Sequence, residues 1–128
     1  MRKRILQPAS KALPSIQAAF EQFQKQNQLK NLSQGTIDFY SSKARHFFNF
    51  LEGTDQPIDF ITEEIVVDYI FHLKEKRLHD TTINTYLRMV RAFLYWCMDK
   101  GYLERFPIRL IRADSPIKEA YTSNELER

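Results

Sequence analysis

Glycine and proline occur at only a few places in this chain, so the stretches between them are long enough for helices. The 128 residues include three Gly and five Pro. Within these stretches, apolar residues recur three and four positions apart, the spacing that gives an α-helix one apolar side. Hydrophobic residues make up 43% of the sequence, which is enough for a core and argues against general disorder. The sequence therefore predicts an all-α fold, a four-helix bundle with short connections and no strand.

Local signals give the expected bounds of these helices. Serine and threonine are good N-caps because their side-chain oxygens accept hydrogen bonds from the first free N–H groups of a helix. In chain order, the predicted helices open at Pro14 and Ser15, at Ser33, at Thr62, and at Asp80 or Thr81. The first helix is expected to end within the polar stretch 25–31. Gly53 is the predicted end of the second helix, and Gly101 is the predicted end of the fourth, which runs to about Lys100.

The two ends of the chain differ from this helical middle. We expect 1–13 to be a flexible basic arm, 14–108 to be the helical domain, and 109–121 to be a linker that carries Arg109 and Arg112. In 122–128, Thr122 and Glu125 form a capping box, the signal for a helix that begins there. One helical turn is not stable alone. The sequence therefore predicts that the chain is truncated, with 122–128 opening another domain.

Charge is segregated along the chain. The formal net charge is +3, which permits nucleic-acid binding without arguing strongly for it. The first 14 residues contain four cations and no acid, whereas 54–80 contain seven acids against Lys74, Lys76 and Arg77. The N-terminus is thus basic and the middle of the chain acidic.

Residues for catalysis or metal binding are missing from this pattern. None of the three histidines, His46, His72 and His79, has a partner at a metal-ligand spacing, and no phosphate-binding loop is present. Cys97 stands alone in an apolar helical phase, which predicts a buried, reduced thiol in a cytoplasmic protein. No membrane span or signal peptide is recognisable. We expect no cofactor, no metal and no catalytic residue in this stretch.

Two helix faces could contact DNA. On the fourth helix, Thr81, Asn84, Arg88 and Arg91 fall at i, i+3, i+7 and i+10 and form a predicted polar row, with Thr82 beside its start. Arginine can pair with phosphate or guanine, and asparagine with adenine. On the second helix, the candidate contacts at the acid-free start are Ser33, Gln34 and Thr36. Lys43 follows two turns after Thr36 on the same side and is the fourth candidate. Both faces could equally be ordinary solvated surfaces.

Two aromatic residues lie outside the main stripe of the second helix. Phe39 and Phe50 are expected to pack against the first helix. The alternatives are contacts with DNA or with another protein subunit.

The order of these features resembles the N-terminal core-binding (SAM-like) domain of tyrosine recombinases and phage integrases. The resemblance runs from about Ile16 to Leu126. It rests on four segments in order: LSQGTIDFYSSKARHFFNFL, PIDFITEEIVVDYIFHL, TTINTYLRMVRAFLYWCMDKGYLERFP and AYTSNELER. The family usually has Asn before the terminal proline of the third segment, where this chain has Phe106. The last segment resembles the entry into the catalytic domain.

The resemblance implies a DNA-binding role in site-specific recombination and DNA integration. In this family the domain and the catalytic domain close as a clamp around a half-site of double-stranded DNA, and further recombinase subunits assemble on that DNA. The catalytic domain holds the Arg, Lys and His groups and the tyrosine that forms a phosphotyrosine bond. None of these is recognisable in 1–128, so this stretch is not itself an enzyme, although the parent protein is expected to be one.

The resemblance also assigns roles to the two faces. The predicted contacts mostly touch phosphates, and Asn84 and Arg88 are the candidates for reading bases. Two other interpretations stay open. The chain could be a stand-alone DNA-binding fragment, or a helical protein-interaction module that uses Phe39, Phe50 and its acidic third helix.

Overall fold

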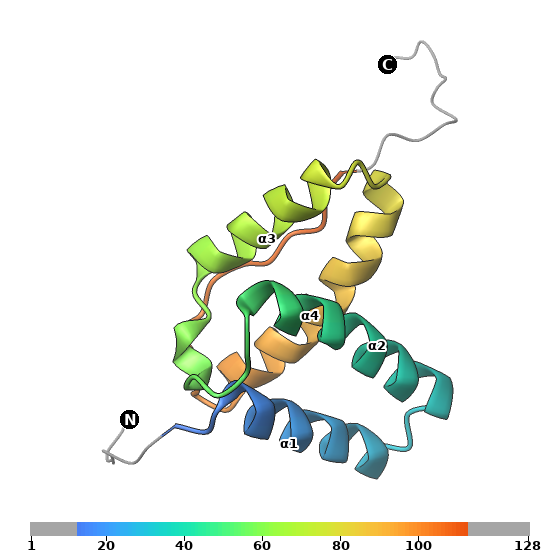
Figure 1. The fold of residues 1–128 in the computed structure, drawn as a ribbon. Coiled ribbons are helices and arrows are strands. Elements are labelled where there is room, and N and C mark those ends of the chain that lie inside the picture. The colour runs from blue at the N-terminus through green and yellow to red at the C-terminus, as the bar shows by residue number, and fades with distance from the viewer. Residues whose placement is uncertain (1–12, 113–128) are drawn as a thin grey trace.

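The computed structural model describes residues 13–112, which form four α-helices and one short 3-10 helix. In chain order these are α1 (Ile16–Leu29), α2 (Gln34–Leu51), η1 (Ile58–Phe60), α3 (Glu63–Glu75) and α4 (Asp80–Asp99) (Figure 1). Within this range, extended chain pairs only in an isolated antiparallel bridge between Ser15 and Pro57. The predicted all-α class is therefore confirmed. The first twelve residues of the predicted arm, most of the linker and the predicted helix start in 122–128 lie outside the described residues.

The predicted caps open the first three helices. Ser15 Oγ accepts from the N–H of Ala18 at 3.0 Å, and Ser33 Oγ accepts from the N–H of Thr36 at 3.1 Å. Thr62 caps α3 in the same way, through the N–H of Ile65 at 3.3 Å. Each helix thus begins at a local side-chain cap, and at the start of α1 the N–H groups of Ile16 and Gln17 also donate to the carbonyls of Gln56 and Thr54.

The helix ends follow the prediction with one difference. At the end of α4, Gly101 has φ +79°, and the N–H of Tyr102 donates to the carbonyl of Cys97 at 2.9 Å. This six-residue closure with glycine in the left-handed region is a Schellman motif. At the end of α2, Glu52 takes the left-handed conformation, with φ 64°, and Gly53 follows it. The predicted stop of α2 is therefore off by one residue.

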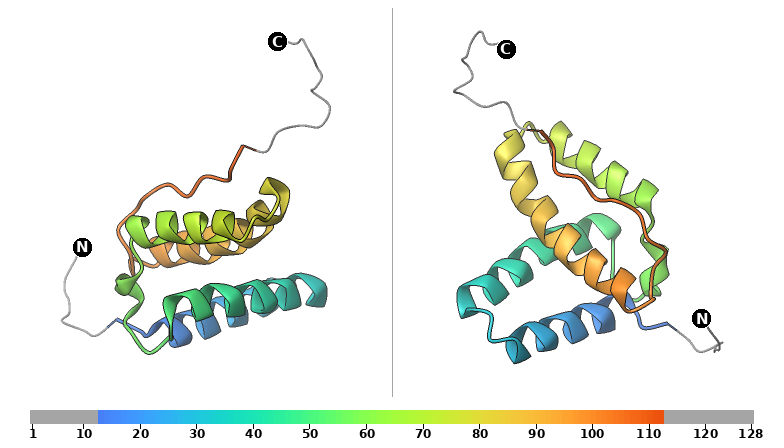
Figure 2. Two further views of the ribbon diagram at one scale, coloured as in Figure 1. Left: turned by 45° about the horizontal axis from the view of Figure 1, so that its top comes forward. Right: turned by 180° about the vertical axis from the view of Figure 1, so that it is seen from behind.

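The helices pack in two layers, with α4 in the middle of the contacts. Figure 2 shows α1 and α2 side by side in one layer, and α3 and α4 in the other. α4 contacts each of the other three helices. Phe93 of α4 is fully buried, and its ring centre lies 5.3 Å from Phe20 and 5.4 Å from Phe23 of α1. Phe48 of α2 completes this aromatic group, with its ring centre 5.3 Å from Phe20.

After α4 the chain runs back along the α3–α4 layer without regular structure (Figure 2). Ile108 is buried, and its N–H donates to Tyr95 Oη at 2.9 Å. Leu110 and Ile111 pack partly buried against the core. The chain is thus attached to the helices beyond residue 108, where the sequence predicts the end of the domain.

Cys97 lies in this core with no exposed surface. Burial raises the pKa of its thiol to about 12, so the thiol stays protonated at neutral pH. Both observations agree with a structural thiol. None of the helices described within 13–112 is long and apolar enough to cross a membrane.

Candidate nucleic-acid interface

The start of α2 and the middle of α4 meet at a shallow groove of about 440 Å³. Ser33 and Thr36 line it from α2, and Arg88 lines it from α4. All three are predicted DNA contacts, and they come from separate parts of the sequence. The fold brings them together on one surface, which we call the α2–α4 face.

The α2 side of this face presents hydroxyls and backbone N–H groups. Ser33 Oγ lies 3.0 Å from Thr36 Oγ1, besides capping the helix. The first N–H groups of an α-helix have no partner within the helix, and they carry the positive end of its dipole. An anion at this position would therefore meet several donors.

Gln34 is less free than the sequence suggests. Its amide Nε2 donates to the carboxylate of Asp38 at 2.9 Å, one turn further along α2. Both side chains are exposed. An acid therefore stands beside the start of α2, and this reduces the positive potential there.

Lys43 is held between aromatic rings of two helices. Its Nζ lies 4.7 Å from the ring centre of Tyr86 on α4 and 5.8 Å from that of Phe39 on α2. Such cation–π contacts fix an ammonium group without neutralising it. The sequence alone does not connect Lys43 with Tyr86, because only the packing of α2 against α4 brings the two side chains together.

The predicted polar row on α4 is not a single exposed row. Asn84 is 7% exposed, and both ends of its amide are bonded to the backbone of Ile111. Its Nδ2 donates to the carbonyl of Ile111 at 2.7 Å, and its Oδ1 accepts from the N–H of Ile111 at 2.7 Å. The expectation that Asn84 is exposed and free to read a base is therefore wrong. The residue fastens the C-terminal segment to α4.

The other members of the row divide between two sides of α4. Thr81 and Arg88, seven residues apart, share one side and are exposed. Arg91 lies seven residues after Asn84 and is half-buried, on the side that carries the C-terminal segment. Thr82 is exposed in the first turn of α4. Thr85, which the prediction omitted, lies between Thr81 and Arg88 and donates to the carbonyl of Thr81 at 3.0 Å.

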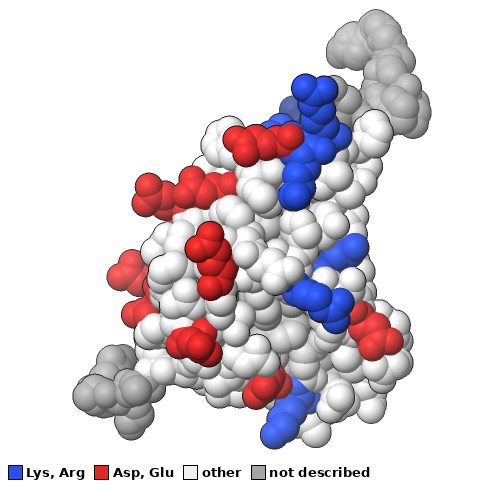
Figure 3. Space-filling view, viewed as in Figure 1, with Lys and Arg blue, Asp and Glu red and all other residues white. Residues whose placement is uncertain are grey.

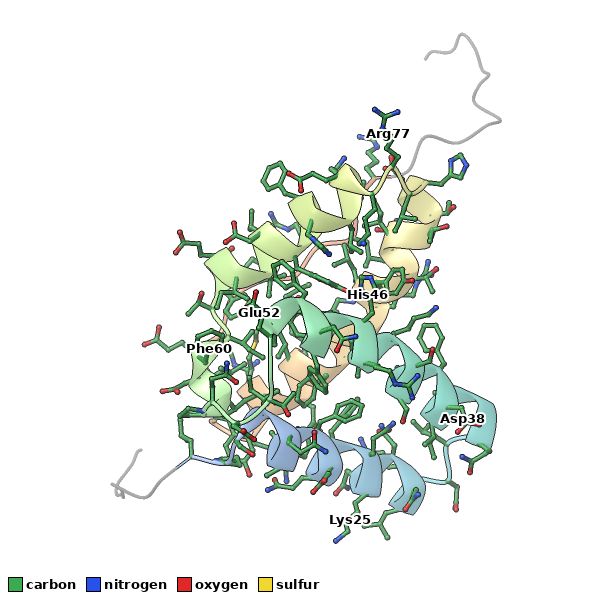
Figure 4. All side chains as sticks on the ribbon, viewed as in Figure 1. Lys25, Asp38, His46, Glu52, Phe60 and Arg77 are labelled. Carbon is green, nitrogen blue, oxygen red and sulfur yellow. The ribbon has the colours of Figure 1, made fainter. Side chains whose placement is uncertain are left out.

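His46 lies where α2, α3 and α4 meet, one turn after Lys43 (Figure 4). Its Nδ1 is 2.8 Å from Tyr69 Oη, and its ring centre is 4.6 Å from that of Tyr86. Burial raises the pKa of Tyr69, so its hydroxyl keeps its proton at neutral pH. Burial, and then the charge of Lys76, lower the pKa of His46. The neutral imidazole is therefore the form that this packing favours.

Of the two aromatic residues outside the main stripe of α2, Phe50 has a different partner from the one expected. The ring centre of Phe50 lies 5.1 Å from Tyr69 and 5.0 Å from His72, both on α3. Phe50 therefore packs against α3 rather than α1. Phe39 lies partly buried in the groove of the α2–α4 face.

Acidic and basic side chains are unevenly distributed on the face that Figure 3 shows. Figure 3 shows acidic side chains along the edge formed by α3 and η1, and most of the basic ones towards the end of α3 and over α2. Within 13–112, no group of three or more His, Cys, Asp or Glu side chains could hold a metal ion. The α2–α4 face itself presents hydrogen-bond donors and the cations Lys43 and Arg88, with the carboxylate of Asp38 beside the start of α2.

Comparison with known proteins gives a family for this fold. The sequence profile described as "Phage integrase SAM-like domain" matches residues 15–114, most of the chain. A protein named "Putative tyrosine recombinase TTE1313", from Caldanaerobacter subterraneus subsp. tengcongensis, is 27% identical over 95 residues, which cover 73% of this chain and 31% of the relative. The chain thus spans about a third of the length of this curated relative. No solved structure matches the chain.

Proposed function

Because the chain belongs to the phage integrase SAM-like domain family, and so is the N-terminal domain of a tyrosine recombinase or integrase, we propose that it binds double-stranded DNA through the α2–α4 face. The observation that carries this proposal is the convergence of Ser33, Thr36 and Arg88 on one groove, with Lys43 beside it on α2. Residues that contact one DNA backbone must lie on one surface, and these do.

The chemistry of the face suits phosphate. The N–H groups and hydroxyls at the start of α2 can donate to phosphate oxygens, and Arg88 can pair with a phosphate through two donors. Lys43 adds a charge that the ring of Tyr86 holds in position. Contacts of this kind give affinity and register without much choice of sequence. With Asn84 withdrawn, Arg88 is the residue proposed to reach base edges.

The proposed contacts differ in strength along the face. Thr81 and Thr82 would extend it by about two helical turns from Arg88, towards the start of α4. Gln34 would bind DNA only after its amide releases the carboxylate of Asp38. Arg91 would contact DNA only at the edge of the face that carries the C-terminal segment. We expect Lys43 and Arg88 to dominate the salt-dependent part of the affinity.

The role in the parent protein follows from the family and is part of the proposal. The domain would hold one half-site of a recombination site while a separate catalytic domain cuts and rejoins the strand through a phosphotyrosine. Other recombinase subunits would bind the neighbouring half-sites, in the cytoplasm. The described residues would bind and position the DNA, and the separate catalytic domain would supply the catalytic groups.

Fluorescence anisotropy with a labelled duplex, at several salt concentrations, tests this proposal. We expect weak binding whose affinity falls steeply with salt, because each neutralised phosphate adds about 0.9 to the slope of log K against log salt. Arg88→Gln should weaken binding and reduce that slope by about one.

A matched control is available on α2. Arg45 is exposed and lies nine residues after Thr36, about half a turn out of phase, so it points away from the groove. Arg45→Gln removes the same charge and should leave the slope unchanged. Equal effects of Arg45→Gln and Arg88→Gln would show that only net charge matters. Absence of binding at low salt would favour a protein-interaction module instead.

A further inference from the structure

A second groove, of about 590 Å³, lies away from the α2–α4 face. It runs between η1 and the first turn of α3 on one side and residues 101–106, which follow α4, on the other. Its lining includes the buried side chains of Ile61 and Leu103 and the half-buried ring of Phe106. The proposed DNA contacts use none of these residues.

The same groove has an acidic rim. Asp59, Glu63 and Glu104 line it, and all three are exposed. Arg105 is the one cation in the lining, and its guanidinium is paired with Asp99 at 2.7 Å. An occupant should therefore offer cations next to apolar side chains, in an extended segment that a groove between two chain segments can hold.

The N-terminal chain enters the fold beside this groove. The N–H of Ile58 donates to the carbonyl of Pro14 at 2.9 Å, and Ser15 is bridged to Pro57. This pairing is antiparallel, so the chain before Pro14 heads in the direction that the chain after Pro57 takes. That direction leads to Asp59, the first residue of the groove.

The first twelve residues have the composition that the groove requires. Arg2, Lys3 and Arg4 are followed directly by Ile5 and Leu6, and no acid occurs before residue 21. An extended chain spans up to about 3.5 Å per residue, so the eleven steps from Leu13 to Arg2 can cover nearly 40 Å. The thirteen residues of α3 cover only about 20 Å. Reach therefore does not limit docking.

We propose that the basic segment Arg2–Leu6 docks in this groove of its own chain. In this arrangement Ile5 and Leu6 would cover Phe106 and the small exposed part of Leu103, and the three cations would face the carboxylates of the rim. The interaction is partly electrostatic at an exposed site, so salt weakens it. While docked, these cations are withheld from DNA. Binding of the arm to DNA phosphates and docking in the groove therefore exclude each other.

Amide chemical shifts of the full, ¹⁵N-labelled chain test the docking. The triple variant Arg2→Gln, Lys3→Gln, Arg4→Gln should shift the amides of residues 59–63 and 101–106, which are far away in sequence. The control Lys25→Gln, Lys30→Gln changes exposed cations around the end of α1, and it should leave those amides in place. The reciprocal variant Asp59→Asn, Glu104→Gln should shift the amides of residues 2–6, whereas Asp68→Asn should not.

Three results would overturn the proposal. Shift changes confined to residues 1–8 in the triple variant would mean that the arm does not reach the groove. Changes at residues 33–36 instead of 59–63 would place the arm on the α2–α4 face. Groove shifts that fade as the protein is diluted would identify the occupant as the arm of a second copy.

Discussion

Replacing Asn84 with alanine should destabilise the domain by about 2 kcal/mol. The side chain makes two hydrogen bonds of 2.7 Å to the backbone of Ile111, and each is worth about 1 kcal/mol net. Ile111 is only partly buried, so water can reach the two freed backbone groups and the cost stays near this sum. The loss is a large fraction of the roughly 5–15 kcal/mol that stabilises a domain.

Urea denaturation followed by circular dichroism measures this change, and amide hydrogen exchange locates it. The N–H of Ile111 should lose its protection in Asn84→Ala, while amides in the middle of α4 keep theirs. Asn49→Ala is the matched control, because Asn49 is exposed on α2. It should leave the free energy of unfolding unchanged or raise it slightly, since alanine is the better helix former.

The same variant separates a structural role from DNA reading. Under conditions where Asn84→Ala is folded, its affinity for duplex DNA should match that of the unsubstituted chain. Two outcomes would show that Asn84 does not have this structural role. One is a change in unfolding free energy below about 0.5 kcal/mol with Ile111 still protected. The other is a large loss of DNA affinity with Ile111 still protected, which would return Asn84 to the interface.

Three further predictions follow from the contacts described above. Ser33→Asp keeps an acceptor for the N–H of Thr36, so the free energy of unfolding should change by less than about 0.5 kcal/mol. The new carboxylate should nevertheless weaken DNA binding in anisotropy measurements. Unchanged binding would show that Ser33 does not lie in the interface. Burial and then the charge of Lys76 lower the pKa of His46 below its ordinary 6.5, so the unfolded state binds protons more readily than the folded state. In urea denaturation, the free energy of unfolding should therefore fall as the pH drops through 6.5 towards the folded-state pKa. The same pH dependence in His46→Gln would contradict this expectation. Phe93→Ala should cost about 3–5 kcal/mol in urea denaturation because the ring is fully buried, and a cost below about 1 kcal/mol would contradict the described core.

The helices could be predicted because their signals are local. Ser15, Ser33 and Thr62 each cap a helix through an N–H three residues away, and a sequence window of that size contains the whole interaction. Gly101 ends α4 for an equally local reason, its left-handed φ. The apolar stripes gave the buried sides, since helical periodicity is also local.

The errors occurred where a partner lies far away in the sequence. Asn84 has the spacing of an exposed residue when α4 is considered alone, and its partner Ile111 lies 27 residues later in a segment without periodicity. Phe50 packs on α3 instead of α1, and its partner depends on where these two helices lie around α2. The contact between Lys43 and Tyr86 depends on a different pair of helices, because it forms where α2 packs against α4. No local pattern encodes these three contacts.

The most direct test of the α2–α4 face as the DNA-binding surface is a titration of the ¹⁵N-labelled chain with a short duplex, followed by amide chemical shifts. We expect the largest changes at residues 33–36 and around Tyr86 and Arg88, and we expect these changes to shrink as salt is added. The amides of α3 between residues 63 and 68 should stay in place, because that edge of the molecule is acidic. If the largest changes occur at this acidic edge and residues 33–36 do not shift, the α2–α4 face is not the DNA-binding surface.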